Sequence, residues 1–157
     1  MIGKRNFCVL GTHGPRGPHV AGVGYFACGL NLYIPTGSKT VKARNIRRDP
    51  RVAVHISVPY PLFGGHAPPR SIQFRGTAEI LPFDDAEANS ALDKAPLGMR
   101  LVFRRLARRS PPRFGENIWI RVRPLGRIET FMLGVPMTTI FRDESKAIQH
   151  IDVPIPE

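Results

Sequence analysis

The chain has 157 residues, of which 42% are hydrophobic, and a formal net charge of +11 at pH 7. This length is typical of one domain with its own hydrophobic core, and no internal repeat divides it. We expect a single domain over residues 1–157, with a core at 6–132 and a C-terminal tail at 133–157. No apolar run reaches the ~20 residues of a membrane-spanning helix, and none near the N-terminus is as long as a signal-peptide core. A cytoplasmic protein without membrane contact is therefore expected.

The cysteines and histidines predict neither a disulfide framework nor a metal site. Cys8 and Cys28 form no CxxC pair, so we expect buried thiols. The five histidines are scattered, and none lies in an HExxH motif or beside paired cysteines. The sequence also shows no Ser-His-Asp or Cys-His arrangement of the kind that supports covalent catalysis.

The N-terminal part of the chain predicts an antiparallel meander. Alternating apolar and polar residues indicate strands at 6–13, 19–27 and 30–35, joined by tight turns. The second strand is poor in side chains because it contains Gly22 and Gly24. Glycine inside a strand marks a bulge, a barrel corner or the close approach of another group. Barrel curvature and a flat ligand ring lying against the strand both fit this pattern.

The most informative segment is TGSKTVKARNIRRDPRV, at residues 36–52. It predicts the end of a strand, a basic helix at 39–48 capped by Gly37 or Ser38, and a further strand at 51–58. The Asp-Pro pair between helix and strand disfavours helical backbone and ends the helix.

The first turn of this helix predicts a phosphate site. A helix N-terminus offers unpaired backbone N–H groups and the positive end of the helix dipole. Thr36, Ser38 and Thr40 add hydroxyl groups, while Lys39 and Lys42 add positive charge. These donors together are typical of a site that holds a phosphate. The alternative is a solvated basic helix that only connects two strands.

The middle of the chain predicts a long loop followed by a strand. Residues 59–70 contain four prolines and two glycines, which indicates either a lid or a plain surface loop. Tyr60, Phe63 and His66 are its side chains that could reach a substrate. The cleanest alternation in the chain follows at 71–81 and predicts a strand with one polar or ligand-facing side.

The C-terminal half predicts helices and further strands. A helix begins at Asp84 in a capping box with Glu87, and a second helix follows Pro96. The second helix has a core-facing stripe made by Met99, Val102, Phe103 and Leu106. Strands are expected at 118–122 and 127–132, and a short helix at 143–150. The fold class is therefore mostly β, a small antiparallel barrel with two or three short helices.

Arginine supplies 18 of the 23 basic residues, and they form two clusters, at 39–51 and 100–113. A basic stripe can bind nucleic acid, or it can combine a pocket for a phosphorylated cofactor with a solvated helix face. No helix-turn-helix, zinc finger or aromatic RNA-binding strand accompanies the stripe. Nucleic-acid binding is therefore the less favoured interpretation.

The order of these motifs resembles the pyridoxamine 5'-phosphate oxidase-like family of flavin-binding split β-barrels. A G-x-P turn at Gly17 precedes a strand that ends in Thr36, and Lys42 lies six residues later. The pattern T-x5-K-x2-N-[IL]-x3-P-x-V then follows, and QFRGTA completes the resemblance at 73–78. The resemblance covers roughly residues 6–82 and the strand at 118–122.

The resemblance implies a six-stranded antiparallel split barrel that forms a homodimer and binds FMN at the dimer interface. Lys42 matches the family's phosphate-binding lysine, Thr36 lies at the strand end beside the flavin, and Thr40 takes the place of a phosphate-binding serine. Ser71 lies near the position of a glutamine that faces the flavin. The expected cofactor-binding residues are Ala21, Gly22, Val23, Gly24, Tyr25, Thr36, Ser38, Lys39, Thr40, Lys42 and Ser71.

Two departures argue against pyridoxamine phosphate oxidase activity itself. Val41 stands where the true oxidases have an arginine, and their C-terminal Trp and Arg motif is not evident. The resemblance implies hydride transfer between the flavin and a small organic substrate, with Tyr25, Tyr60 or His66 as candidate proton donors. A deazaflavin coenzyme is the alternative to FMN. A non-catalytic flavin-binding module and a nucleic-acid-binding protein are the rival functions.

Overall fold

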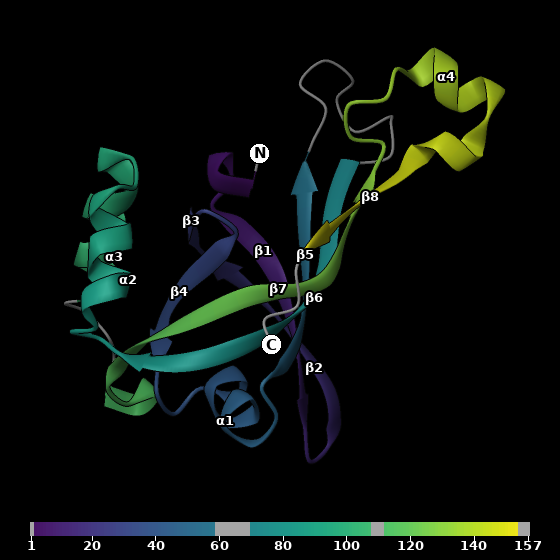
Figure 1. Ribbon diagram of the computed structural model, residues 1–157. Coiled ribbons are helices and arrows are strands. Elements are labelled where there is room, and N and C mark those ends of the chain that lie inside the picture. The colour runs from purple at the N-terminus through teal and green to yellow at the C-terminus, as the bar shows by residue number, and fades with distance from the viewer. Residues whose placement is uncertain (1, 59–69, 108–111, 154–157) are drawn as a thin grey trace.

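The computed structural model describes residues 2–58, 70–107 and 112–153. One antiparallel sheet of eight strands curls into a split barrel, with four short α-helices outside it in the described ranges (Figure 1). The expected fold class is confirmed. The strands are β1 (Phe7–Gly14), β2 (Gly17–Gly24), β3 (Phe26–Cys28), β4 (Asn31–Gly37), β5 (Arg51–Val58), β6 (Arg70–Pro82), β7 (Asn117–Phe131) and β8 (Ile148–Val153).

The sheet has the strand order β2-β1-β5-β6-β7-β4-β3, and β8 adds to β7. The two ends of this order are β2 and β3, which only Tyr25 separates along the chain. The Tyr25 backbone N–H donates to the carbonyl of Asn6 at 2.9 Å. The predicted strand at 19–27 is therefore two strands with a corner between them, and this corner brings the ends of the sheet together.

The two strands expected at 118–122 and 127–132 are one continuous strand, β7, because the chain bends there without leaving the sheet. Its pairing with β6 shifts register between Phe74 and Gly76. A Cβ on Gly76 would lie 2.3 Å from the Arg123 carbonyl oxygen, so the close approach at this bulge requires glycine.

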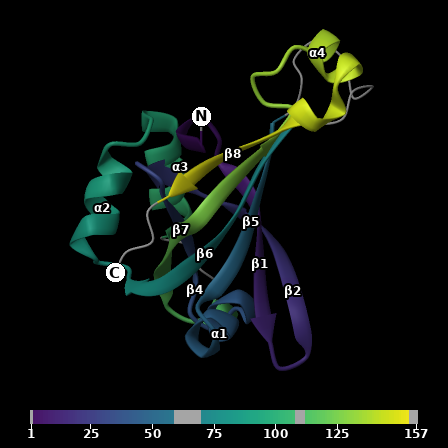
Figure 2. The same ribbon diagram turned by 45° about the vertical axis from the view of Figure 1, so that its right-hand side comes forward.

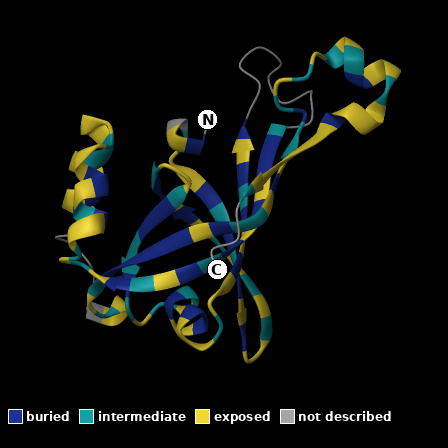
Figure 3. Cartoon of the chain, viewed as in Figure 1, coloured by how far each residue is buried: buried dark blue, intermediate teal, exposed yellow. Residues whose placement is uncertain are grey.

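The main core fills the inside of the barrel. Alternate residues of the strands face inward, as the dark blue stretches of the strands in Figure 3 show. Leu10, Ile34, Ile56, Ile120 and Val122 are among its fully buried members. A second cluster forms where the helices α2 (Ala86–Asp93) and α3 (Leu97–Ala107) cover the sheet.

Trp119 is fully buried in this second cluster and fixes the segment that leads into α2. Its ring stacks on Phe83 with centroids 5.0 Å apart, and its Nε1–H donates to the Phe83 carbonyl at 3.1 Å. The helix starts one residue later than predicted, because Asp85 accepts the hydrogen bond from the Ala88 backbone N–H. The capping box expected with Glu87 is wrong, since that carboxylate binds other side chains.

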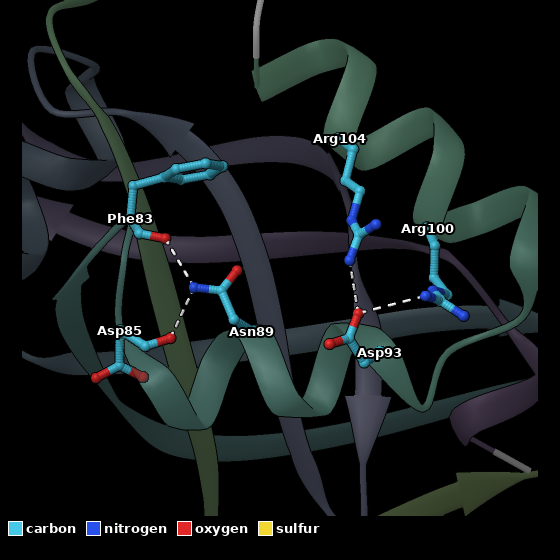
Figure 4. A network of polar contacts seen from close by, with 6 residues as sticks. All are labelled: Phe83, Asp85, Asn89, Asp93, Arg100 and Arg104. Carbon is cyan, nitrogen blue, oxygen red and sulfur yellow. Dashed lines mark hydrogen bonds and ion pairs between the residues drawn. The ribbon is translucent and has the colours of Figure 1, made fainter.

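The core-facing stripe expected on α3 is only partly right. Phe103 is buried, but Val102 is 55% exposed, and the side chain of Leu106 lies outside the described part of the structure. Asp93 of α2 accepts hydrogen bonds from Arg104 at 2.7 Å and Arg100 at 3.5 Å (Figure 4). Two arginines of the second basic cluster thus have an acidic partner on the neighbouring helix.

The helix expected at 143–150 is wrong. The chain forms α4 (Met137–Arg142) and then a 3-10 turn, in which Asp143 accepts from the Ser145 backbone N–H. Residues 148–153 form β8, whose isoleucines at 148 and 151 lie opposite Phe131 and Ile128 of β7. The segment that contains α4 projects from the barrel in Figure 2, and β8 runs back along β7. Among the described residues, no helix combines the length and apolarity that a bilayer crossing requires.

Arg121 joins α2 to the sheet and is 8% exposed. Its guanidinium donates to Glu79 of β6 at 2.6 Å and also to Glu87 of α2. Tyr33 of β4 donates to the other oxygen of Glu87 at 2.6 Å. Arg121 of β7 therefore binds carboxylates of β6 and α2. Tyr33 of β4 joins this network through Glu87.

This network predicts a pH dependence of stability. The hydrogen bonds from Tyr33 and then from Arg121 lower the pKa of Glu87 from its usual 4.5. A carboxyl group whose pKa is lower in the folded state stabilises the fold above pH 4.5, and that contribution is lost as the pH falls through the folded pKa. Glu87 is half-exposed, so solvent reduces the effect. We expect Glu87→Gln to flatten the acid limb of a plot of urea midpoint against pH; an unchanged slope would contradict this.

Candidate functional site

The basic helix predicted from the sequence is α1 (Val41–Arg48), at one end of the barrel (Figure 1). Thr40 is its N-cap residue, so the helix starts two residues later than expected. Ala43 and Ile46 are buried and anchor one side of the helix. Its N-terminus lies directly after β4, at the edge of the barrel core.

A neighbouring segment holds the turn before α1. The Ser38 N–H donates to the Glu116 carbonyl at 2.8 Å, and the Lys39 N–H donates to the Phe114 carbonyl at 2.9 Å. The Arg47 guanidinium donates to the Ser38 carbonyl at 2.7 Å, so this arginine supports the turn. No local pattern could predict this contact, because residues 114–116 are far from the turn along the chain.

Gly37 is where these two segments meet. A Cβ there would lie 2.3 Å from the Phe114 carbonyl oxygen, and a backbone atom cannot rotate away. We expect Gly37→Ala to destabilise the protein by about 1–3 kcal/mol and to displace the turn before α1. Gly3→Ala is the matched control, since nothing lies within 4 Å of its Cβ position. Thermal unfolding of both variants measures the effect, and equal midpoints would contradict it.

The hydroxyl groups beside α1 leave its N-terminus open. Thr40 Oγ1 donates to the Gly37 carbonyl at 2.9 Å and lies 3.5 Å from Thr36 Oγ1. Thr40 therefore makes no side-chain cap to the helix. Within the described chain, the backbone N–H groups of residues 41–43 have no protein acceptor. Such unpaired donors at a helix N-terminus suit an anion.

Lys42 lies in the first turn of α1 and is half-buried. Burial lowers the pKa of its ammonium group. Its side chain makes no hydrogen bond or ion pair with the residues that the structure describes. A partly desolvated cation is costly without a counter-charge. Lys39, by contrast, is exposed.

The expected ring-binding strand divides its residues between two faces. Val23 and Tyr25 are buried in the barrel core, and Ala21 packs against that core, while Gly22 and Gly24 face outward. The β2 strand also contacts β4, the strand that leads into the turn before α1.

The sequence suggested that the outward face of the two glycines is bare, but aromatic rings from other elements cover it. A Cβ on Gly22 would lie 2.8 Å from the Phe7 ring, and one on Gly24 would lie 3.5 Å from the Phe103 ring. Phe7 is 59% exposed, so its ring covers Gly22 from the solvent side. The sequence could not indicate this contact, because it depends on the register between β1 and β2.

Two predicted residues have other positions. Tyr25 is buried and donates its hydroxyl hydrogen to the Ile2 carbonyl at 3.0 Å, and burial raises its pKa, so its candidacy as a proton donor is wrong. Ser71 is buried at the start of β6, opposite Ser57 of β5 and far along β6 from the end near α1. Within a single copy of the chain, Ser71 therefore does not lie close to α1. Tyr60 and His66 lie outside the described residues.

Comparison with known proteins decides the family. The chain matches the pyridoxamine 5'-phosphate oxidase family model over residues 1–126. The chain belongs to this family. No curated protein matches it.

Solved structures of similar fold include several whose names state a cofactor. The heme storage protein HutZ from Vibrio cholerae is 13% identical, with a TM-score of 0.64 over 80% of this chain and 85% of that one. An FAD-binding protein from Mesorhizobium loti is 19% identical, with a TM-score of 0.58 over 78% of this chain and 81% of its own. An F420 reductase is 26% identical, with a TM-score of 0.52 over 81% and 92%. The different cofactors in these names mean that the fold alone does not select one.

Proposed function

We propose that this chain is a flavin-dependent oxidoreductase that binds FMN at the N-terminus of α1. The observation that carries the proposal is the half-buried Lys42 ammonium, which has no anionic partner among the described residues and lies beside open backbone N–H groups. A phosphate would supply the missing counter-charge.

The donors around α1 fit one phosphate group. Lys42 would contribute charge, Thr36 a hydroxyl group, and the first helical turn backbone N–H groups. The Thr40 hydroxyl, which donates to the Gly37 carbonyl, would have to turn to donate to the phosphate. Ser38 and Lys39 belong to the same turn, where their backbone N–H groups already donate to the segment at 114–116. When bound, the flavin supplies hydride transfer to or from a small organic substrate, and the protein holds and orients it.

The structure also supports an activity other than that of the true pyridoxamine phosphate oxidases. Val41 is 37% exposed and offers no charge at the position of their arginine. The chain's single tryptophan is Trp119, which is fully buried and therefore not available to a substrate. A different substrate class is expected.

A homodimer completes the proposal, because Ser71 needs a second copy to approach a flavin at α1. The outer face of the sheet offers a surface for that copy. Val20, Gly11 and Ala53 lie side by side on β2, β1 and β5 and line a hollow of about 720 Å³. The same hollow is also lined by the polar residues His55, Gln73, Arg75, Arg127 and Glu129. A mixture of apolar and polar residues is typical of protein–protein interfaces.

Val20 provides the test of this interface, since it is 69% exposed. We expect Val20→Glu to convert the dimer to a monomer, because burying a carboxylate at the interface carries a large desolvation cost. Leu97→Glu on α3 is the matched control, with 66% exposure away from this face. Sedimentation velocity measures both variants. A dimeric Val20→Glu protein, or a monomeric Leu97→Glu protein, would place the interface elsewhere.

A turnover assay tests whether the protein is an oxidoreductase. The purified protein is loaded with FMN and mixed without oxygen with NADH or NADPH, and the flavin absorbance is followed before and after an electron acceptor is added. Bleaching and recovery through many cycles support an oxidoreductase. A flavin that no donor reduces and no acceptor oxidises would indicate a non-catalytic binding module. Turnover with deazaflavin and not with FMN would assign the other cofactor.

A further inference from the structure

A second basic site lies on a different side of α1 from Lys42. The helix rests beside the turn between β1 and β2 (Figure 1). Residues of both segments line a concave surface of about 530 Å³. This volume lies in the range of small-molecule sites. Residues 41, 44, 45 and 48 line it from the helix, at the spacing of one helical face. Lys42 does not line it.

The charge of this surface has one sign. Arg44 and Arg48 line it from the helix, and Arg16 lines it from the turn, with no acidic residue among the lining side chains. None of the three arginines forms an ion pair with any residue that the structure describes. A basic residue near a helix C-terminus interacts favourably with the helix dipole. This interaction explains the position of Arg48, but not those of Arg16 and Arg44.

Buried polar groups also line this surface. Asn45 is 5% exposed, and its Nδ2 donates to Thr12 Oγ1 at 3.0 Å. A Cβ on Gly14 would lie 2.4 Å from Asn45 Oδ1, so glycine is what lets the helix approach the turn this closely. His19 of β2 also lines the surface, and its Nδ1 is buried with no hydrogen-bond partner among the described residues. The surface lined by the three arginines therefore also contains a polar atom, His19 Nδ1, without a hydrogen-bond partner among the described residues.

We propose that this surface, between α1 and the β1–β2 turn, binds a small polyanion that carries a phosphate or several carboxylates. Guanidinium groups match the geometry of both oxyanions and bind them with paired hydrogen bonds. The bound oxyanion offsets the repulsion among Arg16, Arg44 and Arg48. The site is separate from the flavin phosphate at Lys42, and it does not depend on the flavin proposal.

The test is a calorimetric titration of the full chain with inorganic tripolyphosphate. Arg44→Gln and Arg48→Gln are each expected to weaken binding by roughly tenfold or more, the effect of losing a charge-assisted contact. Arg142→Gln is the control, since it removes the same charge from an exposed position on α4. Lys42→Ala separates this site from the flavin phosphate. Arg142→Gln is expected to bind as the wild type does. Lys42→Ala is expected to lose at most the anion bound at the α1 N-terminus and to keep the binding that Arg44→Gln and Arg48→Gln weaken.

Amide chemical shifts of the wild-type protein keep the test independent of any variant that fails to fold. Tripolyphosphate is expected to shift the backbone amides of Arg16, Gly17, His19 and residues 44–48. Equal weakening by Arg142→Gln would show only an effect of net charge, and weakening by Lys42→Ala alone would place the anion at the flavin site. A short single-stranded DNA that binds far more tightly, with a steep loss on adding salt, would instead indicate a nucleic-acid surface. Each of these three results would overturn the proposal.

Competition identifies the source of the polyanion. If neither FMN nor a deazaflavin displaces tripolyphosphate, the natural ligand is a separate molecule. If a deazaflavin displaces it and FMN does not, the ligand is the anionic extension of that cofactor. Displacement by FMN would overturn the separation of the two sites.

Discussion

Replacing Lys42 with alanine is expected to weaken FMN binding by roughly 10–150-fold. The substitution removes one charge-assisted contact to the phosphate, which is worth about 1.5–3 kcal/mol. The full range applies because the lysine is half-buried and burial already lowers its pKa, so solvent screens the contact less than at an exposed site. Fluorescence titration of the apo protein with FMN measures the dissociation constant.

Two comparisons sharpen this result. Lys94→Ala removes a charge from an exposed lysine outside the α1 region and should leave the affinity for FMN unchanged. Riboflavin, which lacks the phosphate, should bind the wild-type protein and Lys42→Ala equally. Wild-type affinity for FMN in Lys42→Ala would mean that the phosphate lies elsewhere.

Replacing Arg121 with methionine is expected to destabilise the fold by about 2–4 kcal/mol. The substitution keeps much of the buried volume but removes two charge-assisted hydrogen bonds, to Glu79 and Glu87. Both carboxylates are about half-exposed and regain water, which is why the loss stays below that of a fully buried ion pair. Urea unfolding measures the change.

Arg127 on the same strand provides the control. It pairs with Asp152 at 3.5 Å, and both side chains are more than half exposed. Arg127→Met should therefore cost no more than about 1 kcal/mol. Similar losses for the two arginine variants would show that Arg121 contributes through general packing and charge, and that it does not fasten α2 to the sheet.

Strict local patterns were enough to predict most of the barrel. The strand expected at 51–58 has those bounds in the structure, because its buried and exposed residues alternate without interruption. The strand expected at 71–81 extends by one residue at each end. The helix at 39–48 begins two residues late, since Thr40 keeps extended backbone as the N-cap.

Contacts between distant segments could not be predicted in this way. Glu87 has the spacing of a capping box, but Arg121, 34 residues away, binds it instead. Phe7 covers Gly22 only because β1 and β2 pair in a particular register. The β8 strand follows turn residues that also suit a helix, and pairing with β7 decides between the two.

The candidate site shows the same division. The threonines and Lys42 follow from one continuous stretch of sequence, and the structure places that stretch at an open helix N-terminus. The sequence also located the arginines at 44 and 48 and the turn that contains Arg16, but not that this turn faces the helix. Their shared surface exists only after β1, β2 and α1 have packed together.

A flavin held through its phosphate at α1 would give the purified protein a visible colour. The most direct measurement is the visible absorbance spectrum of the purified protein, followed by the mass of any small molecule released on heating. We predict a flavin spectrum and a released molecule with the mass of FMN. A colourless protein that releases no flavin or deazaflavin, and binds neither on titration, would contradict flavin binding at α1.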